Sequence, residues 1–276
     1  VLQILDETSE VIEYSHRLEQ KSSELEIASD NLRKANEQLQ ELDRLKDDFL
    51  STISHELRTP LTSIRSFGEI LFDTPEIDLA QRKQFLSVII SESERLTRLI
   101  NQILDLAKME AGSMDWEMSE VDAREAIEEA LVTMSSLMDD KSIALDLKLP
   151  DNLPHVFVDR DRLIQVIVNL LSNAVKFCDG SEPVVKIAAE VDGDTVLVRV
   201  ADNGPGVPDD VEDMIFEKFQ QVGNTFVNKP KGTGLGLLIS RQIVEHFGGK
   251  IWSEKAEQGA DFRFTLPFTL SFQIAE

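Results

Sequence analysis

Basic residues and cysteine are scarce in this sequence, and long apolar runs are missing. The 28 Lys and Arg face 51 Asp and Glu, so the formal net charge is −23. Nucleic acids and anionic membranes both bind clustered cations, so we expect neither nucleic-acid binding nor direct membrane contact. No apolar stretch approaches the roughly 20 residues that cross a bilayer. The single cysteine, Cys178, cannot form a disulfide within the chain, which favours a reducing, cytoplasmic setting.

The beginning of the chain lacks an initiator Met and the basic, apolar pattern of a signal peptide. This indicates a fragment or a processed chain. The length of 276 residues suits roughly two domains of about 150 residues each, and a hydrophobic content of 42% excludes a disordered chain. We therefore expect a soluble, acidic protein of two or three parts.

The first part contains no glycine or proline before Pro60, and its apolar residues recur every seven positions. The repeat consists of Ile4, Val11, Leu18, Leu25, Leu32 and Leu39. Such a repeat predicts that residues 1–41 form a coiled coil, because it keeps one apolar seam facing a partner helix. After Leu39 the apolar positions change phase, as an inserted stammer would cause. A plain dimerising stalk and a signalling helix with two competing registers both fit this pattern.

The second part, residues 42–112, is predicted to be a helical hairpin. The first helix continues to about Leu71, and the turn signal at 73–76 precedes a second helix that Asp78 caps and that reaches about Glu110. The second helix has one apolar face. Two such hairpins in a homodimer would make a four-helix bundle.

His55 is the first residue in this hairpin that suggests chemistry. Its neighbours Ser54 and Glu56 are polar, so its side chain is expected to point outward. A neutral imidazole has a lone pair for attack, and Glu56 could orient the ring or accept its proton. Thr59 follows one helical turn later on the same face. On this local pattern alone, a surface histidine before a helical proline is more often incidental than functional.

The third part, residues 113–276, is predicted to be a two-layer α/β sandwich. Helical spacing favours helices at 122–140, 160–178 and 237–247, the second of them capped by Asp159. Alternating or short apolar runs predict strands at 143–149, 156–158, 184–191, 196–201, 250–254 and 261–268. Helices over one face of a mixed or antiparallel sheet form two layers.

Three polar residues share one face of the helix at 160–178. Asn169 and Asn173 are four residues apart, and Lys176 extends the same face. An amide oxygen suits Mg²⁺, and a lysine suits a phosphate. A solvated outer helix face is the alternative interpretation of this pattern.

Two glycine-rich segments follow in this domain. In 202–206 (DNGPG), Asp202 could accept the amino group of adenine and reject guanine, while the glycines let the base approach the backbone. The segment 231–237 (KGTGLGL) opens a helix with exposed amides, as an anion site does, and differs from the Walker pattern. Residues 220–230 between them are interpreted as a lid.

Five segments taken in order resemble the motifs of sensor histidine kinases. Residues 55–60 (HELRTP) are similar to the H-box and 169–177 (NLLSNAVKF) to the N-box. Residues 202–207 (DNGPGV) are similar to the G1 box, 216–219 (FEKF) to the F-box and 232–237 (GTGLGL) to the G2 box. The resemblance implies a histidine-phosphotransfer hairpin followed by an ATP-binding domain of the gyrase, chaperone and kinase superfamily, within a larger sensor that can be membrane-bound.

The resemblance also implies a role for each matching residue. His55 would accept the phosphoryl group, with Glu56 as base or orienting group, and Thr59 would complete an E-x-x-T pattern linked to dephosphorylation of the response regulator. Asn169 resembles the Mg²⁺ ligand, Asn173 and Lys176 the phosphate contacts, and Asp202 the adenine-reading carboxylate. The loops would shape the ATP pocket through Gly204, Gly206, Lys231, Gly232, Thr233, Gly234, Leu235 and Gly236.

The expected activity is therefore phosphoryl transfer from Mg·ATP to His55 and then to an aspartate of a response regulator. Cys178 departs mildly from the family, in which hydroxyl residues are frequent at this position, and is expected to be a small buried side chain. Three other functions stay open: an ATPase of the same superfamily, a nucleotide-binding coiled-coil scaffold, and an enzyme that acts chiefly as a phosphatase of the response regulator. Superfamily ATPases carry a glutamate where this sequence has Asn169, which disfavours steady ATP turnover.

Overall fold

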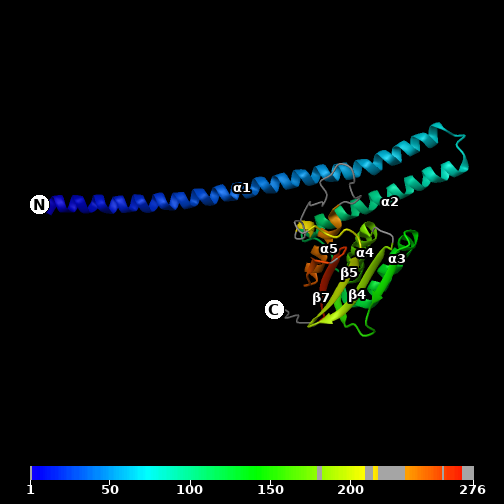
Figure 1. Ribbon diagram of the computed structural model, residues 1–276. Helices are drawn as coiled ribbons and strands as arrows, with labels where there is room; N and C mark the ends of the chain where they lie inside the picture. The colour runs from blue at the N-terminus through cyan, green and yellow to red at the C-terminus, as the bar shows by residue number, and fades with distance from the viewer. Residues whose placement is uncertain (1, 179–181, 209–213, 217–233, 257, 269–276) are drawn as a thin grey trace. The chain divides into compact units, whose positions relative to one another are not determined.

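The computed structural model describes residues 2–178, 182–208, 214–216, 234–256 and 258–268, with side chains from residue 17 onward except at 19, 42, 45 and 48 (Figure 1). The chain divides into two units, Val1–His55 and Glu56–Glu276.

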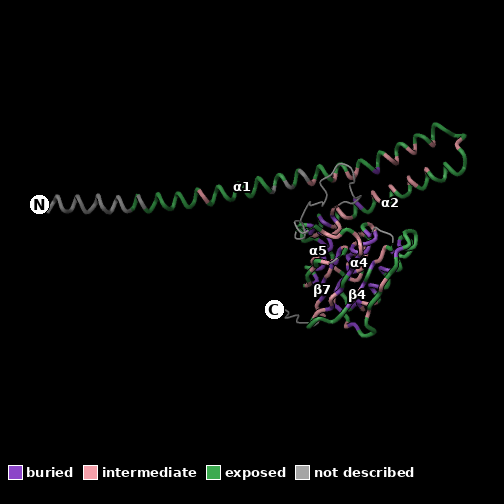
Figure 2. Tube along the Cα trace, in the orientation of Figure 1, coloured by how far each residue is buried: buried purple, intermediate pink, exposed green. Residues whose placement is uncertain are grey.

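The first unit consists of the greater part of helix α1, which runs from Leu2 to Asp73. Its seventh-position leucines are exposed, with exposed fractions between 54% and 72% at Leu18, Leu25, Leu32 and Leu39. Figure 2 shows this stretch as an exposed helix. The predicted apolar seam is therefore uncovered within a single chain.

The second unit begins with the last turns of α1 and helix α2, Leu79–Glu110. The predicted cap at Asp78 is confirmed, because its carboxylate accepts the amides of Ala80 and Gln81 at 2.8 and 3.0 Å. Phe67 and Phe85 bring the two helices together, with ring centroids 5.1 Å apart. Pro60 lies inside α1 and is buried, and the helix continues through it.

The predicted α/β sandwich is confirmed. Five strands form a mixed sheet in the order β2-β4-β5-β7-β6, in which only β2 and β4 are parallel. The strands are β2 (Ala144–Lys148), β4 (Val184–Asp192), β5 (Thr195–Asp202), β6 (Ile251–Glu254) and β7 (Asp261–Pro267). Strands β4 and β5 are joined by a tight turn, in which Gly193 has a φ of 59°.

Three helices cover one face of this sheet (Figure 1). They are α3 (Ala123–Asp140), α4 (Arg160–Phe177) and α5 (Leu235–His246), with α4 packed between the other two. Burial alternates along β5, so its even-numbered residues from Val196 to Val200 face the helices. The core between the layers includes Ile167, Phe264 and Leu266, and Figure 2 shows it as the buried centre of this unit.

Two elements were not predicted from the sequence. Strand β1 (Met118–Asp122) pairs antiparallel with β3 (His155–Asp159), and a single-turn 3₁₀ helix spans Met214–Phe216. Strand β1 has only Val121 buried, so it lacks the apolar alternation that marks a strand. Among the described residues, no helix combines the length and hydrophobicity that a bilayer crossing needs.

Candidate functional site

Asp202 ends strand β5 and is buried, with 7% of its surface exposed. Its Oδ1 accepts the amide of Gly204 at 2.8 Å and the amide of Ala260 at 3.4 Å. Burial raises the pKa of this carboxyl above its ordinary value, and the two backbone amides partly offset that effect. A buried acceptor of this kind is suited to bind an amino group such as that of adenine.

The glycines after Asp202 permit close backbone contacts. A Cβ on Gly204 would lie 2.2 Å from the carbonyl oxygen of Phe177, and one on Gly206, whose φ is 81°, would lie 2.7 Å from the carbonyl oxygen of Gly259. Only glycine fits such positions. The loop after β5 is therefore pressed between the end of α4 and the residues before β7.

Asn203 holds the same loop by its side chain. Its Oδ1 accepts the amide of Val184 at 2.9 Å and the thiol of Cys178 at 3.0 Å. Its Nδ2 donates to the carbonyl oxygen of Glu182 at 2.7 Å. The predicted burial of Cys178 is confirmed, and its thiol is also a hydrogen-bond donor.

The polar face predicted for α4 is present in the structure. Asn169, Asn173 and Lys176 are half-buried, while Val166, Ile167 and Leu170 on the other side are fully buried. Asn169 Nδ2 donates to the hydroxyl of Ser240 on α5 at 2.9 Å. This contact turns Asn169 Oδ1 toward Gly236, where an added Cβ would lie 2.1 Å from that oxygen.

The side-chain oxygen of Asn169 is a possible ligand for a metal ion. No group of three or more His, Cys, Asp and Glu that could hold a metal exists in the described part of the chain. The Asn169 amide oxygen, which lies where a Cβ of residue 236 would be, fits a Mg²⁺ that takes most of its ligands from phosphates and water.

Lys176 provides a partly desolvated cation on the same helix face. Burial lowers the pKa of its ammonium group, the nearby Glu56 carboxylate raises it, and Arg95 lowers it again. The Nζ atom lies over the ring of Phe177, 4.5 Å from its centroid. A cation with reduced hydration attracts phosphate more strongly than an exposed one.

The second glycine loop is described only at its end. Lys231, Gly232 and Thr233, together with the predicted lid at 220–230, lie outside the described residues. Gly234 has a φ of 69° and precedes α5, whose first residue, Leu235, is buried. The helix therefore starts at the predicted loop, and a helix N-terminus is a favourable place for an anion.

The described parts of both loops border α4. Gly204 contacts it at Phe177, and Gly236 contacts it at Asn169, eight residues earlier. At 1.5 Å per residue the two contacts are about 12 Å apart along the helix, a distance that a nucleoside triphosphate can span. The arrangement can therefore hold a base at one end and phosphates with a metal at the other.

His55, Glu56 and Thr59 lie on α1. His55 is exposed, which confirms the outward orientation, and Thr59 is also exposed. Glu56 is half-buried and accepts a hydrogen bond from Arg95 of α2 at 2.9 Å. The Glu56 carboxylate thus has a cationic partner that the sequence pattern did not indicate.

Several residues around the site were missed in the sequence. Ser240, Gly259 and Ala260 contact Asn169 or Asp202, and a Cβ on Gly259 would lie 1.8 Å from the carbonyl oxygen of Asp202. A glycine shortly before the strand predicted at 261–268 was the one available signal. Ser240 had none, because a single serine within an apolar helix is common.

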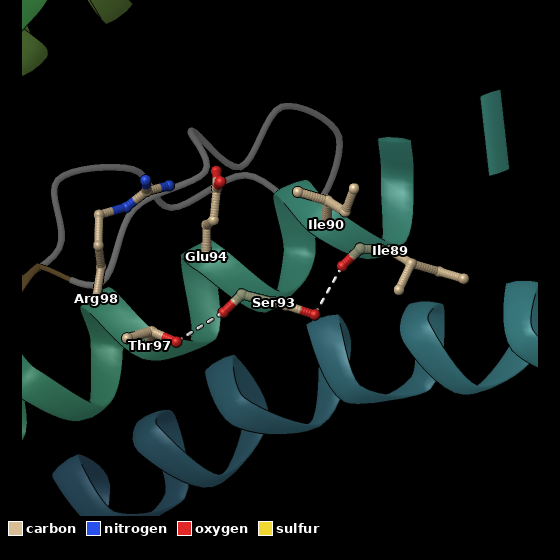
Figure 3. A pocket seen from close by; sticks show the side chains of 6 residues that line it. All are labelled: Ile89, Ile90, Ser93, Glu94, Thr97 and Arg98. Carbon is tan, nitrogen blue, oxygen red and sulfur yellow. Dashed lines mark hydrogen bonds between the residues drawn. The ribbon is translucent and has the colours of Figure 1, made fainter. Parts of the chain in front are cut away.

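A shallow pocket lies elsewhere, on one face of α2 (Figure 3). Its lining residues follow helical spacing, and two of them, Ser93 and Thr97, donate to carbonyl oxygens of their own helix. The lining consists of Ile89, Ile90, Ser93, Glu94, Thr97 and Arg98. None of the predicted site residues belongs to it.

Comparison with protein families yields two matches. The model described as histidine kinase-, DNA gyrase B-, and HSP90-like ATPase matches residues 158–270. The model described as His Kinase A (phospho-acceptor) domain matches residues 45–112. The two matches lie in the order and in the regions that the motifs predicted.

Individual relatives agree with these matches. Hybrid signal transduction histidine kinase D of Dictyostelium discoideum is 34% identical over 258 residues, which cover 91% of this chain and 17% of that protein. The chain spans between 17% and 55% of the length of the first curated relatives it matches.

Two solved structures have a similar fold. The catalytic domain of histidine kinase ThkA is 34% identical with a TM-score of 0.50, covering 55% of this chain and 99% of that one. The complex of ThkA with response regulator protein TrrA contains a chain 29% identical to this one, with a TM-score of 0.61, covering 80% of this chain and 61% of that one.

Proposed function

Because this chain belongs to the histidine kinase family, we propose that it transfers the terminal phosphoryl group of ATP to His55 and then to an aspartate of a response regulator. The buried carboxylate of Asp202 carries the proposal, because it is an acceptor with a raised pKa that is otherwise costly to bury. In this proposal Asp202 recognises the adenine amino group, with Gly204 and Gly206 allowing the base to approach.

At the other end of the pocket, Asn173 and Lys176 would contact the phosphates, together with the loop from Lys231 to Gly236. Asn169 would hold Mg²⁺ through its Oδ1, and the ion would neutralise phosphate charge. The protein would contribute mainly positioning and electrostatic stabilisation, as is usual in phosphoryl transfer. The His55 imidazole would attack in line, and Glu56 would orient the ring or take its proton.

Asn169 also argues against an ATPase as the main function. An amide cannot accept a proton from water, and Asn169 already donates to Ser240. The uncharged side chain leaves the phosphate site without a general base at this position, so ATP turnover without phosphotransfer should be slow.

We further propose that the chain acts as a homodimer with three parts, at 1–41, 42–112 and 113–276. The exposed leucines of α1 support a coiled coil, since exposed fractions above 50% at every seventh residue leave an apolar stripe in water. Exposed apolar side chains on the hairpin, among them Phe72, Leu79 and Ile90, support a four-helix bundle between two chains.

The proposed partner is the receiver domain of a response regulator, and the solved complex of ThkA with response regulator protein TrrA supports a partner of this class. An upstream sensor module would supply the signal, since the matched relatives are much longer than this chain. Glu56 and Thr59, one helical turn apart, would also promote dephosphorylation of the regulator. We place this activity in the cytoplasm.

Radiolabelled ATP given to mixed dimers tests the proposal. One subunit carries His55→Ala and the other carries Asp202→Ala, so each homodimer lacks either the acceptor or the nucleotide site. Wild-type protein should gain acid-labile phosphate on His55, and both homodimeric variants should gain none. Label on the mixed dimer assigns transfer between subunits, and its absence assigns transfer within one. His55→Ala should still bind ATP, and label retained on it would contradict the proposal.

A further inference from the structure

We infer that Asn203 is a positioning residue for nucleotide recognition, and that the Cys178 thiol acts with it. This inference rests on the proposed function and identifies what holds the adenine-binding loop in place. Neither residue was assigned a role in that function. Asn203 follows Asp202 directly, and its side chain joins the loop after β5 to the connection between α4 and β4, which includes Cys178.

The hydrogen bonds that the Asn203 side chain makes to described residues are all long-range. Its partners Cys178, Glu182 and Val184 belong to the connection between α4 and β4, which lies about 20 residues earlier in the chain. A turn asparagine usually bonds to its own backbone two residues on. Here Asp202 makes that local bond, to the amide of Gly204, which leaves the Asn203 amide for tertiary contacts.

These bonds use most of what the Asn203 side chain can offer. Its oxygen has two lone pairs and accepts from Val184 N and Cys178 Sγ, while its nitrogen donates to Glu182 O. A side chain with this many partners has one stable orientation, so the backbone at residue 203 is fixed as well.

The fixed backbone determines where the Asp202 carboxylate points. Asp202 N donates to Ala260 O at 2.9 Å, and Gln258 Nε2 donates to Asn203 O at 3.4 Å, so residues 258–260 hold the loop from the opposite side. Gly259 packs against the Asp202 carbonyl without room for a Cβ. Loss of the Asn203 side-chain hydrogen bonds should therefore let the loop after β5 move away from α4, which would misalign the Asp202 carboxylate.

Cys178 takes part as a hydrogen-bond donor to Asn203. The thiol is buried, and its sulfur lies 3.0 Å from Asn203 Oδ1 and 3.4 Å from Val184 O. A serine would make the same bond with a stronger donor, whereas alanine would leave Oδ1 with one partner. The two substitutions therefore separate the hydrogen bond from simple packing.

Calorimetric titration of the full chain with the non-hydrolysable analogues AMPPNP and GMPPNP tests this inference. Asn203→Ala should weaken AMPPNP binding about tenfold and reduce the preference for adenine over guanine by a similar factor, since several hydrogen bonds are lost. Cys178→Ala should weaken binding about threefold, and Cys178→Ser should restore it. Asn152→Ala, an exposed loop asparagine, is the control and should bind like wild type.

A kinetic split distinguishes positioning from general damage. Asn203→Ala should raise KM for ATP about tenfold while kcat at saturating ATP stays within about twofold, because the saturated pocket realigns the loop. A loss of kcat with unchanged KM would overturn the inference. A melting temperature close to that of wild type would show that the variant is folded.

The only cysteine in the chain supplies a second readout. A thiol reagent should modify buried Cys178 slowly in the wild type, more slowly with AMPPNP bound, and several times faster in Asn203→Ala. Equal rates and equal AMPPNP affinities in Asn203→Ala and wild type would overturn the inference and leave the proposed function intact. Failure of the wild type to bind AMPPNP at all would overturn both.

Discussion

Gly236 leaves the space that the side-chain oxygen of Asn169 occupies. A Cβ at residue 236 would lie only 2.1 Å from that oxygen and 2.9 Å from the amide nitrogen, which itself donates to Ser240. The Ser240 hydroxyl therefore fixes the orientation of the proposed metal ligand, Asn169, and the absence of a Cβ on Gly236 leaves room for its oxygen.

Gly236→Ala should displace the Asn169 amide and weaken Mg²⁺-dependent ATP binding by more than about tenfold, a loss of about 1.4 kcal/mol or more. Titration with AMPPNP at several Mg²⁺ concentrations measures the effect. Gly68→Ala on α1 is the matched control, since a Cβ there meets nothing within 4 Å. It should leave binding unchanged and stabilise the helix by up to about 1 kcal/mol. Unaltered Mg²⁺ dependence in Gly236→Ala would contradict the assignment of Asn169.

Asp202→Asn should abolish selective ATP binding without lowering stability. Burial raises the pKa of Asp202 in the folded protein above the ordinary 3.8, so near that pH the folded state binds more protons than the unfolded chain. The charged carboxylate therefore reduces stability at neutral pH, and this cost disappears as the pH falls through the folded and then the unfolded pKa.

Melting temperatures of the wild type and of Asp202→Asn, measured from pH 7 downward, test this direction of the pH dependence. The variant should melt at the same or a higher temperature at pH 7, and its advantage should shrink toward pH 4. A variant that is less stable at pH 7 would show that the charged form of Asp202 is favoured by contacts stronger than its burial cost.

Thr59→Ala should slow dephosphorylation of the response regulator while autophosphorylation of His55 proceeds at nearly the wild-type rate. Thr59 lies one helical turn after Glu56 and is exposed, so removing its hydroxyl disturbs little packing. Measuring both rates on the same preparation, with Thr62→Ala as an exposed control on the same helix, checks the result. Parallel loss of both activities would assign Thr59 a structural role instead.

Arg95→Ala should destabilise the second unit by about 1–2 kcal/mol. The Arg95–Glu56 pair is 2.9 Å long, and its side chains are only 23% and 13% exposed, so the variant leaves the Glu56 carboxylate poorly hydrated and unpaired. Denaturant unfolding measures the loss. Arg65→Ala removes an exposed pair with Glu69 and should change stability by less than about 0.5 kcal/mol. Equal effects in the two variants would show that the Arg95–Glu56 pair contributes no more to stability than an exposed ion pair does.

Local patterns were sufficient for most of the fold. Asp78 and Asp159 each precede an apolar periodic run, and both cap the helices they were expected to cap. Asn169, Asn173 and Lys176 were placed on one face by spacing alone, and the structure agrees. These features depend on residues within a turn or two of one another, so the sequence contains the whole signal.

Features that depend on distant residues could not be predicted. Strand β1 exists because β3 pairs with it, and its own residues show little apolar alternation. Ser240 and Ala260 reach Asn169 and Asp202 across 71 and 58 residues. The Arg95 partner of Glu56 follows from hairpin packing across 39 residues. No spacing rule connects such positions, because only the folded chain brings them together.

Pro60, buried inside α1, gives this helix a point of easier bending one turn after His55. Its ring nitrogen has no hydrogen to offer to the carbonyl of Glu56, so one rung of the backbone ladder is missing in the turn that follows His55. A helix bends most easily where a backbone hydrogen bond is missing. Bending of α1 should therefore concentrate in the turn after His55, while the flanking helical turns stay intact.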